Sequence, residues 1–152
     1  SIGSECLLMA STHVAHDCIL GNNVIMSNLS TLGGHVELDD WVILGGGVLI
    51  HQFTKIGSHA FIGGGFRAVQ DVPPFILAAE DPLKFQSVNS LGLKRRGFSL
   101  EDRKRIKKIY KIYFRSGSNR KESLKRIIDE IDSSDVKDQI VNFIKTSKRG
   151  II

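Results

Sequence analysis

The chain has 152 residues, of which 41% are hydrophobic and 24% are charged, and its formal net charge is +5. This length suits one domain or a domain with an appendage. No apolar run approaches the length of a membrane-spanning helix, so stable membrane insertion is not expected. No charged segment followed by an apolar one opens the chain, and Cys6 and Cys18 are expected to be free thiols. Both features favour a cytoplasmic protein.

Residues 1–73 carry an aliphatic residue or Met at every sixth position, without a slip of register. That column comprises Ile2, Leu8, Val14, Leu20, Met26, Leu32, Leu38, Leu44, Ile50, Ile56 and Ile62. Four residues after each of the first ten, from Cys6 to Ala60, stands a small or β-branched residue. A hexad repeat is the signature of a parallel β-helix. Three hexads close one coil, so the pattern predicts about four coils in which residues three hexads apart are neighbours.

Each hexad is expected to form a short strand and a corner. Gly or Asp often follows the aliphatic residue, as at Gly3, Gly21, Gly33 and Asp39. Because such residues tolerate unusual dihedral angles, we expect them to form the corners.

The remaining chain divides into two parts. Residues 74–98 begin after the Pro73-Pro74 pair, which interrupts the repeat, and are expected to form an irregular or β-edge connection with a basic end. Residues 99–152 show three stretches of helical periodicity, about 99–116, 120–132 and 135–147, the first with Ser99 as its N-cap. The sequence therefore predicts a mainly β protein with a small C-terminal three-helix domain.

The positive charge is concentrated in the C-terminal half, because Lys55 and Arg67 are the only basic side chains between residues 2 and 73. Such a distribution favours an acidic partner. No nucleic-acid motif accompanies the basic runs. A phosphate-bearing small molecule or an acidic carrier protein is the expected partner.

Four of the five histidines fall close together when the chain is wound in coils of three hexads. His16, His35 and His51 take columns 15, 16 and 14 of successive coils, and His13 takes column 12 of the first. Three interpretations are open: corner residues bonded to backbone, a zinc site with three imidazoles and a water, or a general base. Asp17 and Gln52 could fix a tautomer or hold a substrate, and the bare backbone at Gly34 could offer an oxyanion donor.

Several runs together resemble one enzyme family in order and spacing. They are residues 13–18 (HVAHDC), 33–36 (GGHV), 48–53 (VLIHQF), 70–74 (QDVPP) and 89–98 (NSLGLKRRGF). The family is the bacterial acyl-[acyl-carrier-protein]–UDP-N-acetylglucosamine O-acyltransferases of lipid A biosynthesis. The resemblance implies a homotrimer of left-handed β-helices with helical C-terminal domains and active sites between subunits. It also implies that the chain is the C-terminal part of a longer protein, without the family's N-terminal coils.

The implied reaction transfers a 3-hydroxyacyl or related acyl group from the carrier thioester to the 3-hydroxyl of UDP-N-acetylglucosamine. His16 would be the general base, Asp17 would support it, and the Gly34 N–H would face the oxyanion. The residues implied to contact the sugar, nucleotide, phosphate or acyl chain are His13, His35, His51, Gln52, Gly64, Asn89, Arg95 and Arg96. This chemistry needs a base, an oxyanion donor and positioning, and neither a metal nor a cofactor is expected.

Three alternatives stay open. The chain could be an N-acyltransferase with the same repeat, or a zinc enzyme of carbonic-anhydrase type that uses His16, His35 and His51. It could also be a truncated trimeric scaffold without activity. The length of the acyl chain is not determined by the sequence.

Overall fold

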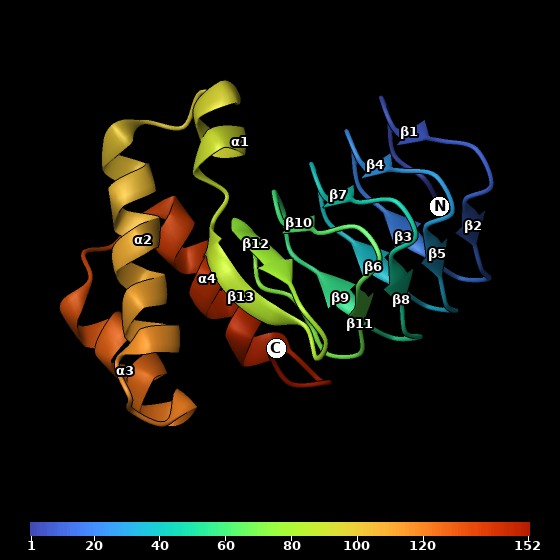
Figure 1. Cartoon of the computed structure of the whole chain (residues 1–152). Coiled ribbons are helices and arrows are strands. Elements are labelled where there is room, and N and C mark those ends of the chain that lie inside the picture. The colour runs from blue at the N-terminus through green and yellow to red at the C-terminus, as the bar shows by residue number, and fades with distance from the viewer. The chain divides into compact units, whose positions relative to one another are not determined.

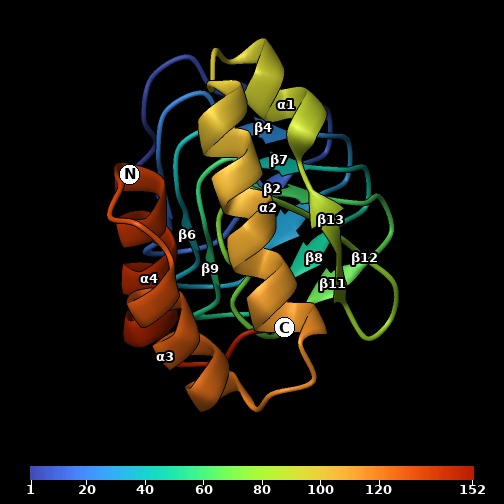
Figure 2. The same cartoon turned by 90° about the vertical axis from the view of Figure 1, so that its left-hand side faces the viewer.

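A computed structural model describes all 152 residues, Ser1–Ile152. The chain divides into two compact units, which we call the prism unit (Ser1–Asn89 with Ser147–Ile152) and the helical unit (Ser90–Thr146). The prism unit is a parallel β-helix, and the helical unit contains four helices (Figures 1 and 2). The predicted fold class is therefore confirmed. None of the helices is long and apolar enough to cross a membrane.

Eleven strands of two residues each form the three faces of the prism, and strands of one face follow one another along the stack (Figure 1). The β1 face contains β1 (Leu7–Leu8), β4 (Ile25–Met26), β7 (Ile43–Leu44) and β10 (Phe61–Ile62). The β2 face contains β2 (His13–Val14), β5 (Thr31–Leu32), β8 (Leu49–Ile50) and β11 (Arg67–Ala68). The β3 face contains β3 (Ile19–Leu20), β6 (Glu37–Leu38) and β9 (Lys55–Ile56). Paired strands lie three hexads apart, as expected: His13 aligns with Thr31, and Thr31 with Leu49.

The aliphatic column and the small column form the core of the prism. From Leu20 to Ile62, and from Cys18 to Ala60, every member of these columns is at most 3% exposed. Burial of one large aliphatic side chain contributes roughly 1.5–3 kcal/mol, so the repeat itself stabilises the prism. In the first coil Ile2 and Leu8 stay 49% and 37% exposed. Both cysteines are free, with Cys18 buried and Cys6 half-buried.

The residues with positive φ at the corners are not the ones expected, which were those directly after the aliphatic column. One residue in six, from Glu5 to Gly65, has a positive φ between 56° and 79°, and nine of these eleven residues are not glycine. Asp17, His35 and Phe53 belong to this column. The left-handed conformation costs about 1–2 kcal/mol for such a residue. Hydrogen bonds between coils offset that cost, because from the second coil onwards each N–H of this column donates to a carbonyl of the preceding coil, as His35 does to His16 at 3.0 Å.

Most glycines that follow the aliphatic column are required for a different reason, which is the close approach of a neighbouring coil. A Cβ at Gly33 would stand 2.7 Å from the backbone nitrogen of Gln52, and one at Gly57 would stand 2.5 Å from that of Pro74. These positions exclude a side chain because the neighbouring atoms are backbone and cannot move away. The expectation that these glycines supply the corner dihedrals was wrong.

The last coil is shorter than the others, and Asp71 compensates for the difference. Ile56 is bridged to Val72, although three full hexads would have placed Pro74 there. The N–H groups of Ile19 and Glu37 donate to carbonyls of the next coil, whereas the N–H of Lys55 donates to the Asp71 carboxylate at 2.8 Å. The other Asp71 oxygen accepts from the Ser147 hydroxyl at 2.6 Å. The buried carboxylate thus replaces a missing carbonyl and holds the returning C-terminal segment.

Residues 74–98, expected to be an irregular or β-edge connection, form regular structure at the edge of a sheet and a short helix. Strand β12 (Ile76–Ala79) extends the β1 face in parallel to β10, and β13 (Lys84–Val88) returns antiparallel to it. The proline pair ends the repeat but does not end the sheet, because the chain rejoins the β1 face slightly early. Helix α1 (Ser90–Arg95) follows and ends in a Schellman motif, in which Gly97 has a φ of +85° and the Phe98 N–H donates to the Leu93 carbonyl.

The three longer helices lie close to the predicted ranges. They are α2 (Leu100–Arg115), α3 (Arg120–Glu130) and α4 (Asp135–Thr146). The Ser99 hydroxyl caps α2 by accepting from the Asp102 N–H at 3.0 Å. Helix α2 contacts both α3 and α4 through a buried face that includes Ile106, Ile109 and Tyr110 (Figure 2). The segment after α4 belongs to the prism unit and not, as expected, to the helical domain.

Candidate active site

The predicted histidine cluster lies on one corner of the prism, where the β2 face meets the β3 face. We define the histidine corner as residues 15–18, 33–36 and 51–54, which connect the strands of these faces in three successive coils. The three-hexad register places Asp17, His35 and Phe53 in one column and His16, Gly34 and Gln52 in the preceding column. The coil geometry therefore brings together residues from three separate parts of the sequence.

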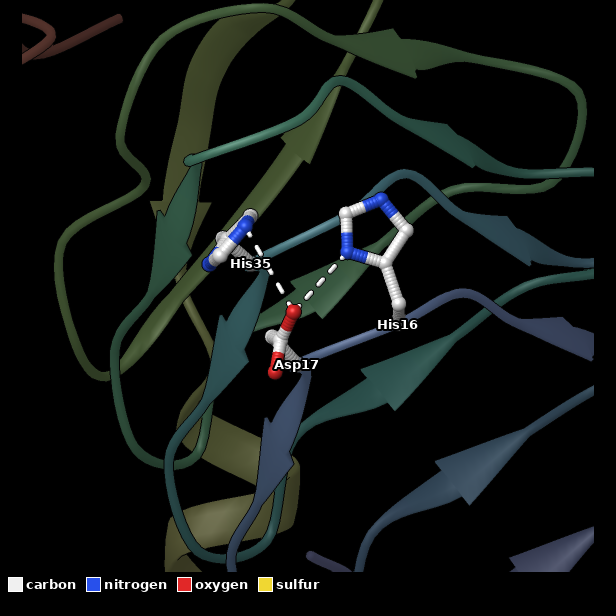
Figure 3. Close-up of side chains that lie close together, drawn as sticks. All are labelled: His16, Asp17 and His35. Atoms are coloured by element: carbon white, nitrogen blue, oxygen red, sulfur yellow. Dashed lines mark hydrogen bonds and ion pairs between the residues drawn. The ribbon is translucent and has the colours of Figure 1, made fainter.

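Asp17 lies between two imidazole rings (Figure 3). Its Oδ2 atom is 3.0 Å from His16 Nδ1 and 3.7 Å from His35 Nε2. The rings of His16 and His35 meet edge to face, with centroids 5.1 Å apart. Asp17 and His16 are thus joined by a direct hydrogen bond.

The cluster is open to solvent. The side chains of His16, Asp17 and His35 are 75%, 66% and 43% exposed. The hydrogen bond from His16, and then the charge of His35, lower the pKa of the Asp17 carboxyl below its ordinary value. Asp17 is therefore ionised at neutral pH and acts as a hydrogen-bond acceptor.

The hydrogen bond to Asp17 determines which nitrogen of His16 can act as a base. A carboxylate only accepts hydrogen bonds, so the proton of a neutral His16 ring belongs on Nδ1. The lone pair then lies on Nε2, the ring nitrogen that does not face Asp17. This is the arrangement by which a carboxylate orients a histidine general base.

Gly34 is needed for the position of the His16 ring. An added Cβ at Gly34 would stand 2.7 Å from Cε1 and 2.8 Å from Nε2 of His16, so the ring rests over this bare stretch of backbone. Gly34 is buried although its corner is exposed. Its N–H donates no hydrogen bond within the chain. A residue with an unused backbone donor therefore lies against the His16 ring.

Three other residues predicted on this edge are not part of the cluster. His51 and Gln52 are exposed in the third coil, and His51 Nδ1 is 3.1 Å from the Gln52 carbonyl oxygen. His13 is exposed on β2, shortly before His16. All three stand on the predicted edge, as the column arithmetic requires.

Phe53 belongs to the cluster and was not expected from the sequence. Its ring stacks on His35, with centroids 4.7 Å apart and an interplanar angle of 8°. The signal was available, because Phe53 follows His35 by three hexads and so shares its column. The contact restricts the His35 ring, whose Nε2 then points towards Asp17.

The remaining predicted residues lie elsewhere. Gly64 is exposed at the corner between the β1 and β2 faces. Asn89 is 7% exposed, and its side-chain amide donates to the His59 carbonyl at 3.0 Å. Arg95 and Arg96 belong to the helical unit, at the end of α1; Arg95 is exposed, and partial burial lowers the pKa of Arg96 below its ordinary value.

One group in the chain could hold a metal ion, and it differs from the zinc alternative raised by the sequence. Its members are His16, Asp17 and His35, whose ligand atoms all lie within 4.8 Å of one another. His51 is not part of it.

Comparison with known proteins gives the family. Residues 71–152 match the family described as "Udp N-acetylglucosamine O-acyltransferase; Domain 2". The chain belongs to this family. A protein from Nautilia profundicola, named acyl-[acyl-carrier-protein]–UDP-N-acetylglucosamine O-acyltransferase, is 47% identical over 150 residues, which are 99% of this chain and 58% of the relative. The protein of the same name from Aliivibrio salmonicida is 41% identical over 152 residues, or 100% of this chain and 58% of the relative.

Solved structures agree with the curated relatives. The UDP-N-acetylglucosamine acyltransferase from Bacteroides fragilis has a solved structure that superposes on this chain with a TM-score of 0.93 and 40% sequence identity. The match covers 97% of this chain and 58% of that one. The enzyme from Campylobacter jejuni is also 40% identical, with a TM-score of 0.91 and coverage of 99% and 58%. The chain therefore spans 58% of the length of the curated relatives described above.

Proposed function

We propose that this chain carries the catalytic base of an O-acyltransferase that acts in the first step of lipid A biosynthesis. The acyl group, a 3-hydroxyacyl or related chain, passes from an acyl carrier protein thioester to the 3-hydroxyl of UDP-N-acetylglucosamine. The observation that carries the proposal is the 3.0 Å hydrogen bond between His16 Nδ1 and Asp17, which leaves the Nε2 lone pair for the substrate. The names of the relatives support this substrate pair.

The reaction needs no group beyond these side chains and backbone. His16 Nε2 takes the proton of the sugar hydroxyl while the hydroxyl oxygen attacks the thioester carbonyl carbon. The Gly34 N–H donates to the oxyanion that forms. The C–S bond then breaks, and the protonated His16 returns its proton to the departing thiolate. Asp17 stabilises the imidazolium between these two transfers.

Substrate contacts are assigned to the other residues that the resemblance implies. His13, His35, His51 and Gln52 position the sugar and nucleotide, because they are exposed polar groups of the same edge. Arg95, Arg96 and Asn89 bind nucleotide and phosphate, for which a guanidinium group is the suited donor. Gly64 limits the length of the acyl chain.

The charge of the two units supports an acidic protein partner. The helical unit has 16 basic and eight acidic side chains, and hence a net charge of +8, whereas the prism unit has five basic and eight acidic ones and a net charge of −3. An acyl carrier protein with an acidic surface would be attracted to the helical unit. A cytoplasmic homotrimer is part of the same proposal.

The test is acyl transfer with UDP-N-acetylglucosamine and a 3-hydroxyacyl carrier protein, with the product measured by mass spectrometry. His16→Ala is expected to lower kcat by about 10²–10⁴-fold, the usual contribution of a general base, without changing the oligomeric state. His59→Gln, on another corner, is the control and should keep the wild-type rate. A wild-type rate in His16→Ala would remove His16 from the role of base. No transfer by the unaltered chain would favour the inactive scaffold.

A further inference from the structure

Two imidazoles and one carboxylate gathered on an exposed corner offer a ligand set as well as a base. His16 and His35 present ring nitrogens, and Asp17 presents an oxygen between them (Figure 3). Imidazole and carboxylate are common zinc ligands in sites that keep an open coordination position. We propose that Zn²⁺ binds His16 Nδ1, Asp17 Oδ2 and His35 Nε2, and that it switches off His16 as a base by reversing its tautomer.

The distances fit a tetrahedral ion after small movements of the side chains. Zinc bonds of about 2.0–2.2 Å place neighbouring ligand atoms about 3.3 Å apart. The two contacts made by Asp17 Oδ2 measure 3.0 Å and 3.7 Å, on either side of this value. The ring nitrogens need only approach one another, and the His16 ring, at 75% exposed, is the one that can rotate. Water would complete the coordination.

The backbone already holds the three residues in place. Asp17 and His35 occupy equivalent corner positions in adjacent coils, and the His35 N–H donates to the His16 carbonyl at 3.0 Å. Phe53 stacks on the His35 ring and restricts its orientation. A site that is largely formed before the ion arrives loses less entropy on binding.

The effect on His16 follows from the count of ring protons. A neutral imidazole has one N–H, which in the free protein faces Asp17 from Nδ1. Zinc at Nδ1 uses that nitrogen's lone pair, so the proton moves through solvent to Nε2. Nε2 then becomes a donor and can no longer accept the substrate's proton. The charge of the ring is unchanged, and no proton is released by this residue.

Metal binding depends only on the three ligands, whereas the loss of acyl transfer rests on the proposed function. The two parts therefore need separate measurements. The first is a titration of the 152-residue chain with Co²⁺, followed by visible absorption, and displacement of the Co²⁺ by Zn²⁺. Asp17→Asn and His35→Asn remove one ligand each and keep a residue that tolerates a positive φ. His51→Gln is the matched control on the same corner.

Each ligand variant is expected to weaken Zn²⁺ binding by more than the roughly 10–100-fold that loss of an outer-shell partner costs, whereas His51→Gln should bind as the unaltered chain does. Equal loss in His51→Gln, or undiminished binding in His35→Asn, would overturn the site. Circular dichroism of each variant establishes that it is folded.

The second measurement is the ¹⁵N spectrum of the His16 ring with and without Zn²⁺. The proton should move from Nδ1 to Nε2 on saturation, and a proton that stays on Nδ1 would overturn the switch. In the acyl-transfer assay, activity should fall in proportion to zinc occupancy, and full activity at saturation would also overturn it. A chain that is inactive even without metal contradicts the proposed function instead, and the ring spectrum still decides the metal site.

Discussion

Replacing Gly34 with alanine should displace the His16 ring and slow acyl transfer while the prism stays folded. The new Cβ would stand 2.7 Å and 2.8 Å from Cε1 and Nε2 of His16. Non-bonded atoms settle at about 3.5–4.0 Å, so the edge of the ring must move by roughly 1 Å. A displacement of that size at a catalytic group can cost about 10²-fold in rate. We expect kcat to fall by about that factor.

The stability of Gly34→Ala should hardly change, because the obstructed atoms are the free end of an exposed side chain. Gly34 has no positive φ, so alanine fits the backbone. A compatible Gly→Ala change stabilises by about 0.4–1 kcal/mol through the unfolded state. The variant also keeps its backbone N–H, so a lower rate would reflect the position of His16 and not the loss of an oxyanion donor.

Gly33→Ala is the control, one residue away. Its Cβ would stand 2.7 Å from the backbone nitrogen of Gln52, which cannot move without shifting the next coil. It should therefore lower the melting temperature, measured by circular dichroism, whereas Gly34→Ala should not. An unchanged kcat at saturating UDP-N-acetylglucosamine in Gly34→Ala, or equal thermal destabilisation by both variants, would refute this reasoning.

Three further predictions concern charge, burial and substrate binding. The hydrogen bond from His16 lowers the pKa of Asp17, so the carboxylate contributes to stability until the pH falls through that lowered pKa. In His16→Ala the pKa of the Asp17 carboxyl, followed by carbon-13 NMR, should shift upward. The Thr54 hydroxyl is buried without a partner, whereas that of Ser30, in the same column, donates at 2.7 Å. Thr54→Val should therefore stabilise by about 1–3 kcal/mol and Ser30→Ala destabilise by about 0.5–1.5 kcal/mol in urea unfolding. Arg95→Ala should raise the KM for UDP-N-acetylglucosamine much more than it weakens carrier binding, as measured by steady-state kinetics and calorimetry.

Each of these three predictions would be contradicted by a specific result. If His16→Ala leaves the Asp17 titration unchanged, the hydrogen bond from His16 is not what lowers the Asp17 pKa. If Thr54→Val is less stable than the unaltered chain, the Thr54 hydroxyl is solvated. For the nucleotide, Lys94→Ala is the control, because Lys94 is an exposed cation next to Arg95. An equal rise of KM in both variants would indicate general charge attraction in place of a phosphate contact.

The histidine corner could be predicted from spacing because a β-helix converts sequence separation into position. A coil of three hexads is enough to place His16, His35 and His51 on one edge, and the structure has them there. Column arithmetic does not give side-chain direction, however. Asp17 and not His51 completes the cluster, and Phe53 stacks on His35, because rotamers depend on the atoms of the coils above and below.

The amino-acid sequence by itself determined the parallel β-helix, its core columns and its three long helices, because period, burial and helix capping are local properties repeated along the chain. Only the tertiary structure decided what each glycine and Asp71 do. Gly33 and Gly34 are adjacent and chemically identical, yet one faces backbone and the other faces the His16 ring. Asp71 replaces a carbonyl in a coil that is shorter than three hexads. Contacts between coils create these roles, and they form only when the chain closes on itself.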